Sequence, residues 1–316
     1  MKQFLSAADV EQPEVLLNLA REIKTDPRAR QWIGRGKTLG LIFMNPSLRT
    51  RMSTQLAARN LGMEVMVLNV NEDGWKLEFE DGAVMNAGAA EHVREAAAVM
   101  GAYCDIIGLR AFAGLKNREQ DYAEQMLNAF SQYCGRPLIS LESAVRHPLQ
   151  SLADMLTIAE HAAVKRPKVV MTWAPHPRAL PQAVPNSFAE WAQLFNHDLV
   201  ITHPEGFELA PQFTQHARIE HNQDAALEGA DFVYVKNWSS WSDYGAIGSG
   251  LDDWQVTAAK LRNSNNAKVM HCLPVRRNVV IGDDVLDSPQ SIVIQQAGNR
   301  VFAAQAVLQS ILGNES

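Results

Sequence analysis

A short apolar run meets the start of a helix in residues 38–54, TLGLIFMNPSLRTRMST. The run at 38–44 is continuous and bounded by turn signals, which is typical of a strand buried on both faces. Pro46 marks a turn, and a helical pattern then covers residues 51–61 before Gly62, a residue common just after helix ends. This strand–turn–helix unit predicts one step of a parallel α/β sheet.

Similar apolar runs recur along the chain and alternate with helical segments. We predict further strands at 64–70, 104–110, 137–141, 168–173, 198–203, 231–236, 268–271 and 291–294. The alternation predicts an α/β fold of two doubly wound parallel-sheet domains linked by helices.

The domain boundary is expected within residues 145–165, which gives domains at 1–150 and 151–316. A helix over 151–164 is predicted to bridge them, and a last helix over 301–313 to pack back on the first domain. Residues 175–187, PHPRALPQAVPNS, hold four prolines. Because proline resists helix and strand interiors, we predict a rigid loop there.

Composition excludes several classes of protein. The chain has 316 residues, 47% of them apolar, and a net charge of −6. A mildly acidic globular chain is a poor partner for nucleic acid. No apolar run approaches the roughly 20 residues of a membrane helix. The first residues, MKQFLSAADVEQPE, lack the apolar core of a signal peptide, so we expect a cytoplasmic protein.

The cysteines and histidines do not form a metal or disulfide pattern. Cys104, Cys134 and Cys272 are scattered, and no HExxH-type pair occurs. We therefore expect no metal and no cofactor. No Gly-x-Gly-x-x-Gly follows an early strand, which argues against a dinucleotide enzyme. A binding protein that holds an anion without turnover is the non-enzymatic alternative.

An anion site is predicted at the helix start after the first strand. Ser47 can cap the helix, and Thr50 lies in the first turn. Helix-start N–H groups attract anions, and Arg49 and Arg51 add bidentate donors for phosphate. An ordinary capped helix is the alternative, but its dipole would disfavour two arginines at this end. The pattern therefore favours phosphate.

Several polar residues follow predicted strands, where open α/β sheets place ligands. His147 could donate a hydrogen bond to a carbonyl oxygen or serve as a structural histidine. The Gln150 side chain could recognise the amide group of a ligand, or it could form a hydrogen bond to the backbone at the helix start. Arg110 could bind a phosphate, or it could be a solvated charge at the end of a strand.

Weaker candidates for substrate contacts are Glu142, His176, Lys236 and the pair Arg276–Arg277. Their charges suit a carboxylate or an ammonium group, although solvated turns would also explain them.

Three segments together resemble a known family. Ser47–Arg51, SLRTR, resembles the Ser-Thr-Arg-Thr-Arg motif of the aspartate/ornithine transcarbamylases, with Leu48 in place of threonine. RHPLQSLAD (146–154) resembles the family's His-Pro-x-Gln motif, and HCLPVRRN (271–278) its His-Cys-Leu-Pro motif. Because the three occur in the family's order, the chain is identified as a member.

The resemblance implies a carbamoyltransferase that binds carbamoyl phosphate. It implies that Thr50, Arg110 and His147 are catalytic and stabilise the developing oxyanion. It also implies a homotrimer with shared active sites, in which Trp75 reaches a neighbouring subunit. The implied carbamoyl-phosphate contacts are Ser47, Leu48, Arg49, Thr50, Trp75, Arg110, His147, Gln150, Cys272, Leu273 and Arg300.

Two segments narrow the resemblance to the acetylornithine/succinylornithine branch. They are NEDGWKLE (71–78) and TWAPHPRALPQAVPNS (172–187). The ornithine branch's Ser-Met-Gly segment is missing. In the acylornithine branch the Pro-rich loop is part of a deep trefoil knot, which the resemblance therefore implies for the C-terminal domain, although knots are otherwise nearly absent.

The acyl group is suggested by Ala90. The resemblance places a glutamate there in acetyl enzymes and a proline in succinyl enzymes. A glutamate would repel a succinyl carboxylate, whereas alanine leaves room. Lys260 points to the acetyl type, whose matching lysine is carboxylated. We expect N-succinylornithine as the acceptor in arginine biosynthesis, with N-acetylornithine as the alternative. The implied acylornithine contacts are Glu142, His176, Lys236, Arg276 and Ala90.

Overall fold

The computed structural model describes residues 1–313, and the chain divides into two compact units. Unit 1 comprises residues 1–114 and 119–149 and the chain from 300 onward. Unit 2 comprises residues 115–118 and 150–299.

Unit 1 contains a four-stranded sheet in the order β2–β1–β5–β6, with every pairing parallel. Its strands are β1 (Thr38–Phe43), β2 (Glu64–Asn69), β5 (Ile106–Arg110) and β6 (Leu138–Glu142). The chain passes from β1 to β2 on one side and then returns to β5 on the other. The strand order therefore reverses between β1 and β5, where open α/β sheets form ligand sites. The predicted parallel α/β architecture is confirmed.

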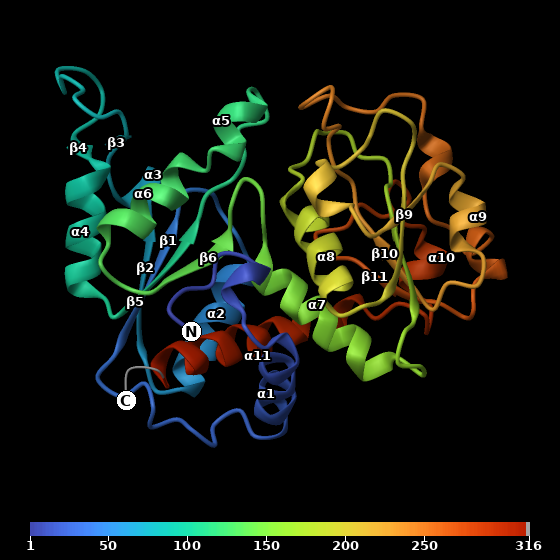
Figure 1. Cartoon of the computed structure of the whole chain (residues 1–316), viewed down its shortest axis with the longest axis horizontal. Helices are drawn as coiled ribbons and strands as arrows, with labels where there is room; N and C mark the ends of the chain where they lie inside the picture. The colour runs from blue at the N-terminus through green and yellow to red at the C-terminus, as the bar shows by residue number, and fades with distance from the viewer. Residues whose placement is uncertain (314–316) are drawn as a thin grey trace. The chain divides into compact units, whose positions relative to one another are not determined.

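Helices flank this sheet (Figure 1). They are η1 (Ala7–Asp9), α1 (Pro13–Thr25), α2 (Arg49–Asn60), α3 (Val70–Asp73), α4 (Val93–Tyr103), α5 (Arg118–Tyr122) and α6 (Gln125–Tyr133). Two short strands, β3 (Leu77–Glu78) and β4 (Glu91–His92), pair separately in parallel.

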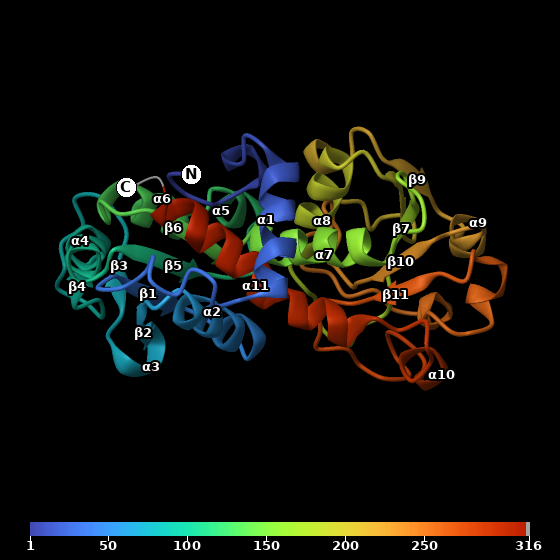
Figure 2. The same ribbon diagram turned by 90° about the horizontal axis from the view of Figure 1, so that it is seen from below.

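The last helix, α11 (Val293–Leu312), contributes its later part to unit 1. In that part, Gln305 accepts a hydrogen bond from Asn60 of α2 at 3.1 Å and donates one to the Pro27 carbonyl at 2.6 Å. The same part of α11 crosses α1 (Figure 2), and Lys24 Nζ of α1 lies 5.8 Å from the centroid of the Phe302 ring. These contacts position Arg300, at the start of that part, near the first turn of α2.

Unit 2 contains a five-stranded parallel sheet in the order β11–β10–β7–β8–β9. Its strands are β7 (Lys168–Thr172), β8 (Asp198–Thr202), β9 (Arg218–Glu220), β10 (Phe232–Val235) and β11 (Lys268–Met270). Its order reverses between β7 and β10. The remaining helices are α7 (Pro148–His161), α8 (Ala183–Leu194), η2 (Pro211–Phe213), α9 (Gln223–Leu227), η3 (Asp252–Trp254), η4 (Lys260–Asn263) and α10 (Asp283–Leu286).

Two local predictions are wrong. Residues 291–294 are not a strand: Ser291 makes an isolated bridge to Val269, and α11 begins at Val293. A short apolar run can begin a buried helix as easily as it forms a strand, so the pattern was ambiguous. The Pro-rich segment is not a loop throughout, because α8 begins at Ala183. Pro185 lies in its first turn, where a missing N–H breaks no helical bond.

A close approach of backbone to backbone constrains unit 1. A Cβ on Gly101 of α4 would lie 1.8 Å from the Cys134 carbonyl oxygen. We expect Gly101→Ala to lower the free energy of unfolding by roughly 1–3 kcal/mol, as overpacking does. Urea denaturation followed by circular dichroism measures it.

The matched control is Gly298→Ala in α11, where nothing lies within 4 Å of the added Cβ. Alanine in a helix interior should raise stability by about 0.5–1 kcal/mol relative to glycine. Equal midpoints for the two variants would show that the predicted clash has no effect.

Candidate active site

The first turn of α2 provides backbone donors at the carboxyl end of β1. The helix begins at Arg49, and Leu48 occupies the cap position. Ser47 lies one residue before the cap, yet its Oγ accepts the Thr50 N–H at 3.3 Å. The helix-start N–H groups and the helix dipole together favour a bound anion.

Arginine side chains gather at this end of unit 1. Arg110 ends β5, and its register partners are Phe43 of β1 and Glu142 of β6. Its Nη1 donates to Glu142 Oε2 at 2.5 Å. Arg300 Nη2 donates to Thr50 Oγ1 at 2.5 Å. Both guanidinium groups are buried, so the fold concentrates positive charge beside the α2 helix start.

His147 lies within the field of these arginines. It is 2% exposed, and its Nε2 is 3.4 Å from Glu142 Oε2. Burial, reinforced by Arg300, Arg110 and Arg49, holds the pKa of His147 well below its usual range. The imidazole is therefore neutral near pH 7 and carries a single N–H. Such a donor can polarise a carbonyl oxygen without adding a further full charge.

Trp75 and Ala90 are brought together by the small β3–β4 pair. Ala90 N donates to the Lys76 carbonyl at 3.0 Å, and Trp75 Nε1 donates to Glu91 Oε2 at 2.9 Å. The Trp75 side chain nevertheless remains 57% exposed, and Ala90 is exposed as well. Both belong to unit 1.

In unit 2, His176, Lys236 and Arg276 follow the carboxyl ends of β7, β10 and β11. Arg276 Nε donates to His176 Nε2 at 3.1 Å, and the Lys236 side chain is buried. Burial, with the charges of Lys236 and Arg276, lowers the pKa of His176. Arg277 lies apart from this group, in exposed ion pairs with Asp283 and Asp287 at 2.7 Å.

Gln150, Cys272 and Leu273 also belong to unit 2. Gln150 Nε2 donates to Asp154 Oδ1 at 2.8 Å. Leu273 N donates to His271 Nδ1 at 2.8 Å, and Leu273 has a φ of +57°, which non-glycine residues rarely adopt. Cys272 is half-buried and forms no disulfide.

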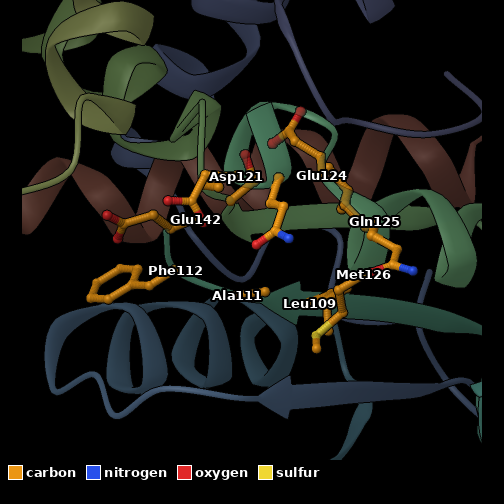
Figure 3. Close-up of a pocket in the computed structure, with 12 residues that line it drawn as sticks. Leu109, Ala111, Phe112, Asp121, Glu124, Gln125, Met126 and Glu142 are labelled. Carbon is orange, nitrogen blue, oxygen red and sulfur yellow. The ribbon is translucent and has the colours of Figure 1, made fainter. Parts of the chain in front are cut away.

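A hollow of about 150 Å³ opens beside Glu142 in unit 1. Asp121 and Glu142 both line it, together with Gln125 and Met126 (Figure 3). Glu124 also lines it, with a φ of +46° and a pKa that burial raises. No sequence signal marked Asp121 or Glu124. The acidic lining is unsuited to phosphate, in contrast to the arginine cluster.

Other site types find no support in residues 1–313. No group of three or more His, Cys, Asp or Glu side chains there is arranged to hold a metal ion. None of the helices in this part of the chain combines the length and apolarity needed to cross a membrane.

Lys260 Nζ donates to Gln223 Oε1 and to the Asp253 carbonyl, and burial lowers its pKa.

Comparison with known proteins matches both parts of the chain to one family. Residues 2–160 match the carbamoyl-phosphate-binding domain of aspartate/ornithine carbamoyltransferases. Residues 181–311 match the aspartate/ornithine-binding domain of the same enzymes.

Individual relatives agree. The chain is 54% identical to an N-succinylornithine carbamoyltransferase of Bacteroides thetaiotaomicron, over 99% of each chain. It is 34% identical to an N-acetylornithine carbamoyltransferase of Xanthomonas campestris pv. campestris, over 99% of this chain and 98% of that one. A solved N-acetyl-L-ornithine transcarbamylase with one glutamate replaced by alanine is bound to carbamyl phosphate and N-succinyl-L-norvaline. It matches with a TM-score of 0.93 and 33% identity, over 98% of this chain and all of that one. The predicted family is therefore confirmed: the chain belongs to the aspartate/ornithine carbamoyltransferases.

Proposed function

We propose that this carbamoyltransferase moves the carbamoyl group of carbamoyl phosphate to the δ-amine of N-succinyl-L-ornithine. The products are N-succinyl-L-citrulline and phosphate, in arginine biosynthesis. The observation that carries the acceptor is the 54% identity to an N-succinylornithine enzyme, against 34% to an N-acetylornithine enzyme. The arginine cluster at the α2 helix start supports the phosphorylated substrate.

The phosphate would bind the first turn of α2, with Ser47, Leu48, Arg49 and Thr50 as donors. Arg300 would share this anion through its contact with Thr50. Arg110 already sits at the sheet's reversal point, where one carboxylate, Glu142, offsets part of its charge. The bound dianion would complete the neutralisation.

The reaction would proceed by attack of the deprotonated δ-amine on the carbamoyl carbon. A C–N bond forms, the carbonyl oxygen gains negative charge, and the C–O bond to phosphate then breaks. Thr50, Arg110 and the neutral His147 would donate to that oxygen, an effect typically worth about 3–4 kcal/mol per donor. The departing phosphate would accept the amine proton. Holding the two reactants close together in a reactive orientation supplies much of the remaining rate enhancement.

The remaining proposed contacts divide by substrate. For carbamoyl phosphate they are Gln150, Cys272 and Leu273, with Trp75 supplied by a neighbouring subunit. For the acceptor they are Glu142, His176, Lys236, Arg276 and Ala90. Lys236 and Arg276 support a succinyl acceptor, because N-succinylornithine has two carboxylates to neutralise and N-acetylornithine has one.

Ala90 supports the same acceptor. Its side chain carries no charge that would repel the succinyl carboxylate. The solved relative bound to N-succinyl-L-norvaline likewise has alanine in place of a glutamate. N-acetylornithine is the second candidate, and Lys260, matched to a lysine of the acetyl type, is the observation that favours it.

A homotrimer with shared active sites is part of the proposal. Leu48, Met52 and Leu56 recur every fourth residue at the start and along α2, and are 68%, 64% and 47% exposed. Such a stripe of large apolar side chains is typical of an interface. The exposed Trp75 fits a residue that completes a neighbour's site.

Further parts of the proposal rest on the branch resemblance. Residues 1–150 would form the carbamoyl-phosphate domain and residues 151–316 the acylornithine domain. The last helix would pack back on the carbamoyl-phosphate domain. The C-terminal domain would hold a trefoil knot. The three cysteines form no disulfide, which supports a reducing, cytoplasmic setting.

Arg110→Ala should lower kcat about 10²–10³-fold, because a donor to the developing oxyanion is lost. A colorimetric assay for the citrulline product, with N-succinylornithine as acceptor, measures it. Arg277→Ala is the control, since its exposed ion pairs lie outside the proposed contacts. Turnover by Arg110→Ala within a few-fold of wild type would refute the assigned role.

Ala90→Glu should lower kcat/KM for N-succinylornithine at least tenfold relative to N-acetylornithine, because the new carboxylate repels the succinyl one. Parallel assays with both acceptors give the ratio. Ala90→Gln adds the same bulk without the charge and should shift the ratio less. If the two variants behaved alike, bulk rather than charge would explain the discrimination.

Met52→Asp should convert the trimer to monomers, because a charge would have to be buried in the apolar stripe. Light scattering coupled to size-exclusion chromatography measures the mass. Val164→Asp, at an exposed valine in unit 2, is the control. A trimer that survived Met52→Asp would place the interface elsewhere.

A further inference from the structure

A buried carboxylate in unit 2 fixes the direction of two amide side chains. Asp154 of α7 is 0% exposed, and its Oδ1 accepts from Gln150 Nε2 at 2.8 Å and from Gln296 Nε2 at 2.7 Å. In both contacts the amide nitrogen is the donor and the carboxyl oxygen is the acceptor. Each amide must therefore turn its NH₂ group toward Asp154 and its oxygen away from it.

The oxygen of Gln296 continues this chain of contacts. It accepts the backbone N–H of His271, directly after β11, at 2.8 Å. His271 Nδ1 in turn accepts the Leu273 N–H at 2.8 Å. The left-handed backbone at Leu273, rarely adopted by a branched residue, is thus held by two successive hydrogen bonds that begin at Gln296.

We propose that Asp154 and Gln296 are positioning residues that hold two acceptors, Gln150 Oε1 and the Leu273 carbonyl oxygen, for the amino group of carbamoyl phosphate. This inference rests on the proposed function, which uses Gln150 and Leu273 as substrate contacts. An amino group offers two N–H donors, which two acceptors can satisfy. A methyl group at the same place offers no donor to either acceptor, so the arrangement selects carbamoyl phosphate against acyl phosphates.

The test compares the binding of three ligands to the full-length enzyme. The dissociation constants of carbamoyl phosphate, acetyl phosphate and inorganic phosphate are measured for wild type, Asp154→Leu, Asp154→Asn and Gln296→Met. Leucine resembles aspartate in shape but removes the acceptor, whereas asparagine retains an oxygen that can accept from both amides. Methionine removes both contacts of Gln296.

We expect Asp154→Leu to weaken carbamoyl phosphate about tenfold, the loss of roughly one hydrogen bond, with acetyl phosphate and phosphate within twofold of wild type. Asp154→Asn should stay within about threefold for all three ligands. Gln296→Met should lower the preference for carbamoyl over acetyl phosphate by several-fold, and it carries the test if Asp154→Leu does not fold.

An unchanged preference in Asp154→Leu and Gln296→Met would overturn the proposal. So would an equal loss of all three ligands, which is the signature of a purely structural role. The preference for carbamoyl phosphate over acetyl phosphate is measured by binding and not by turnover. A wild-type enzyme that transfers no carbamoyl group would therefore count against the proposed function alone. The ratio of the two dissociation constants would still test the positioning role.

Discussion

The ion pair between Arg110 and Glu142 is the constraint on which the candidate site in unit 1 depends. Two adjacent parallel strands place these side chains at one edge of the sheet, and both are buried. A buried charge is tolerated only when paired, and breaking such a pair is strongly destabilising. The pair therefore holds one guanidinium at the point where the strand order reverses, and His147 lies against the same carboxylate.

Positive charge beyond this pair comes from other elements. Arg49 opens α2, and Arg300 is delivered by a helix that returns to unit 1 and is anchored through Gln305. Burial, reinforced by these two arginines and Arg110, holds the pKa of His147 well below its usual range, so this second neighbour of Glu142 is a hydrogen-bond donor rather than a cation. A site with this surplus of buried positive charge is suited to a phosphate dianion.

Unit 2 uses amide-to-carboxyl hydrogen bonds where unit 1 uses an ion pair. Asp154 accepts from two amides, and a series of hydrogen bonds through Gln296 and His271 connects this carboxyl group to the turn at Leu273. Two cationic side chains of that unit, Lys236 and Arg276, follow neighbouring strands of its sheet. The proposed contacts to the phosphate and to the amino group thus rest on different physical interactions in the two units.

The sequence by itself determined the α/β class, eight of the nine predicted strands to within two residues at each end, and the family. Buried parallel strands are continuous apolar runs, and the three motifs are local in sequence, so both are visible without a fold. Only the tertiary structure decided that residues 291–294 begin a helix, that Arg300 meets Thr50, and that Asp121 and Glu124 line a hollow beside Glu142. It also revealed the bonds from Asp154 to Gln150 and Gln296. Apart from the contact between Asp154 and Gln150, these contacts join residues that are distant in the chain. Packing, and not a local sequence pattern, brings such residues together.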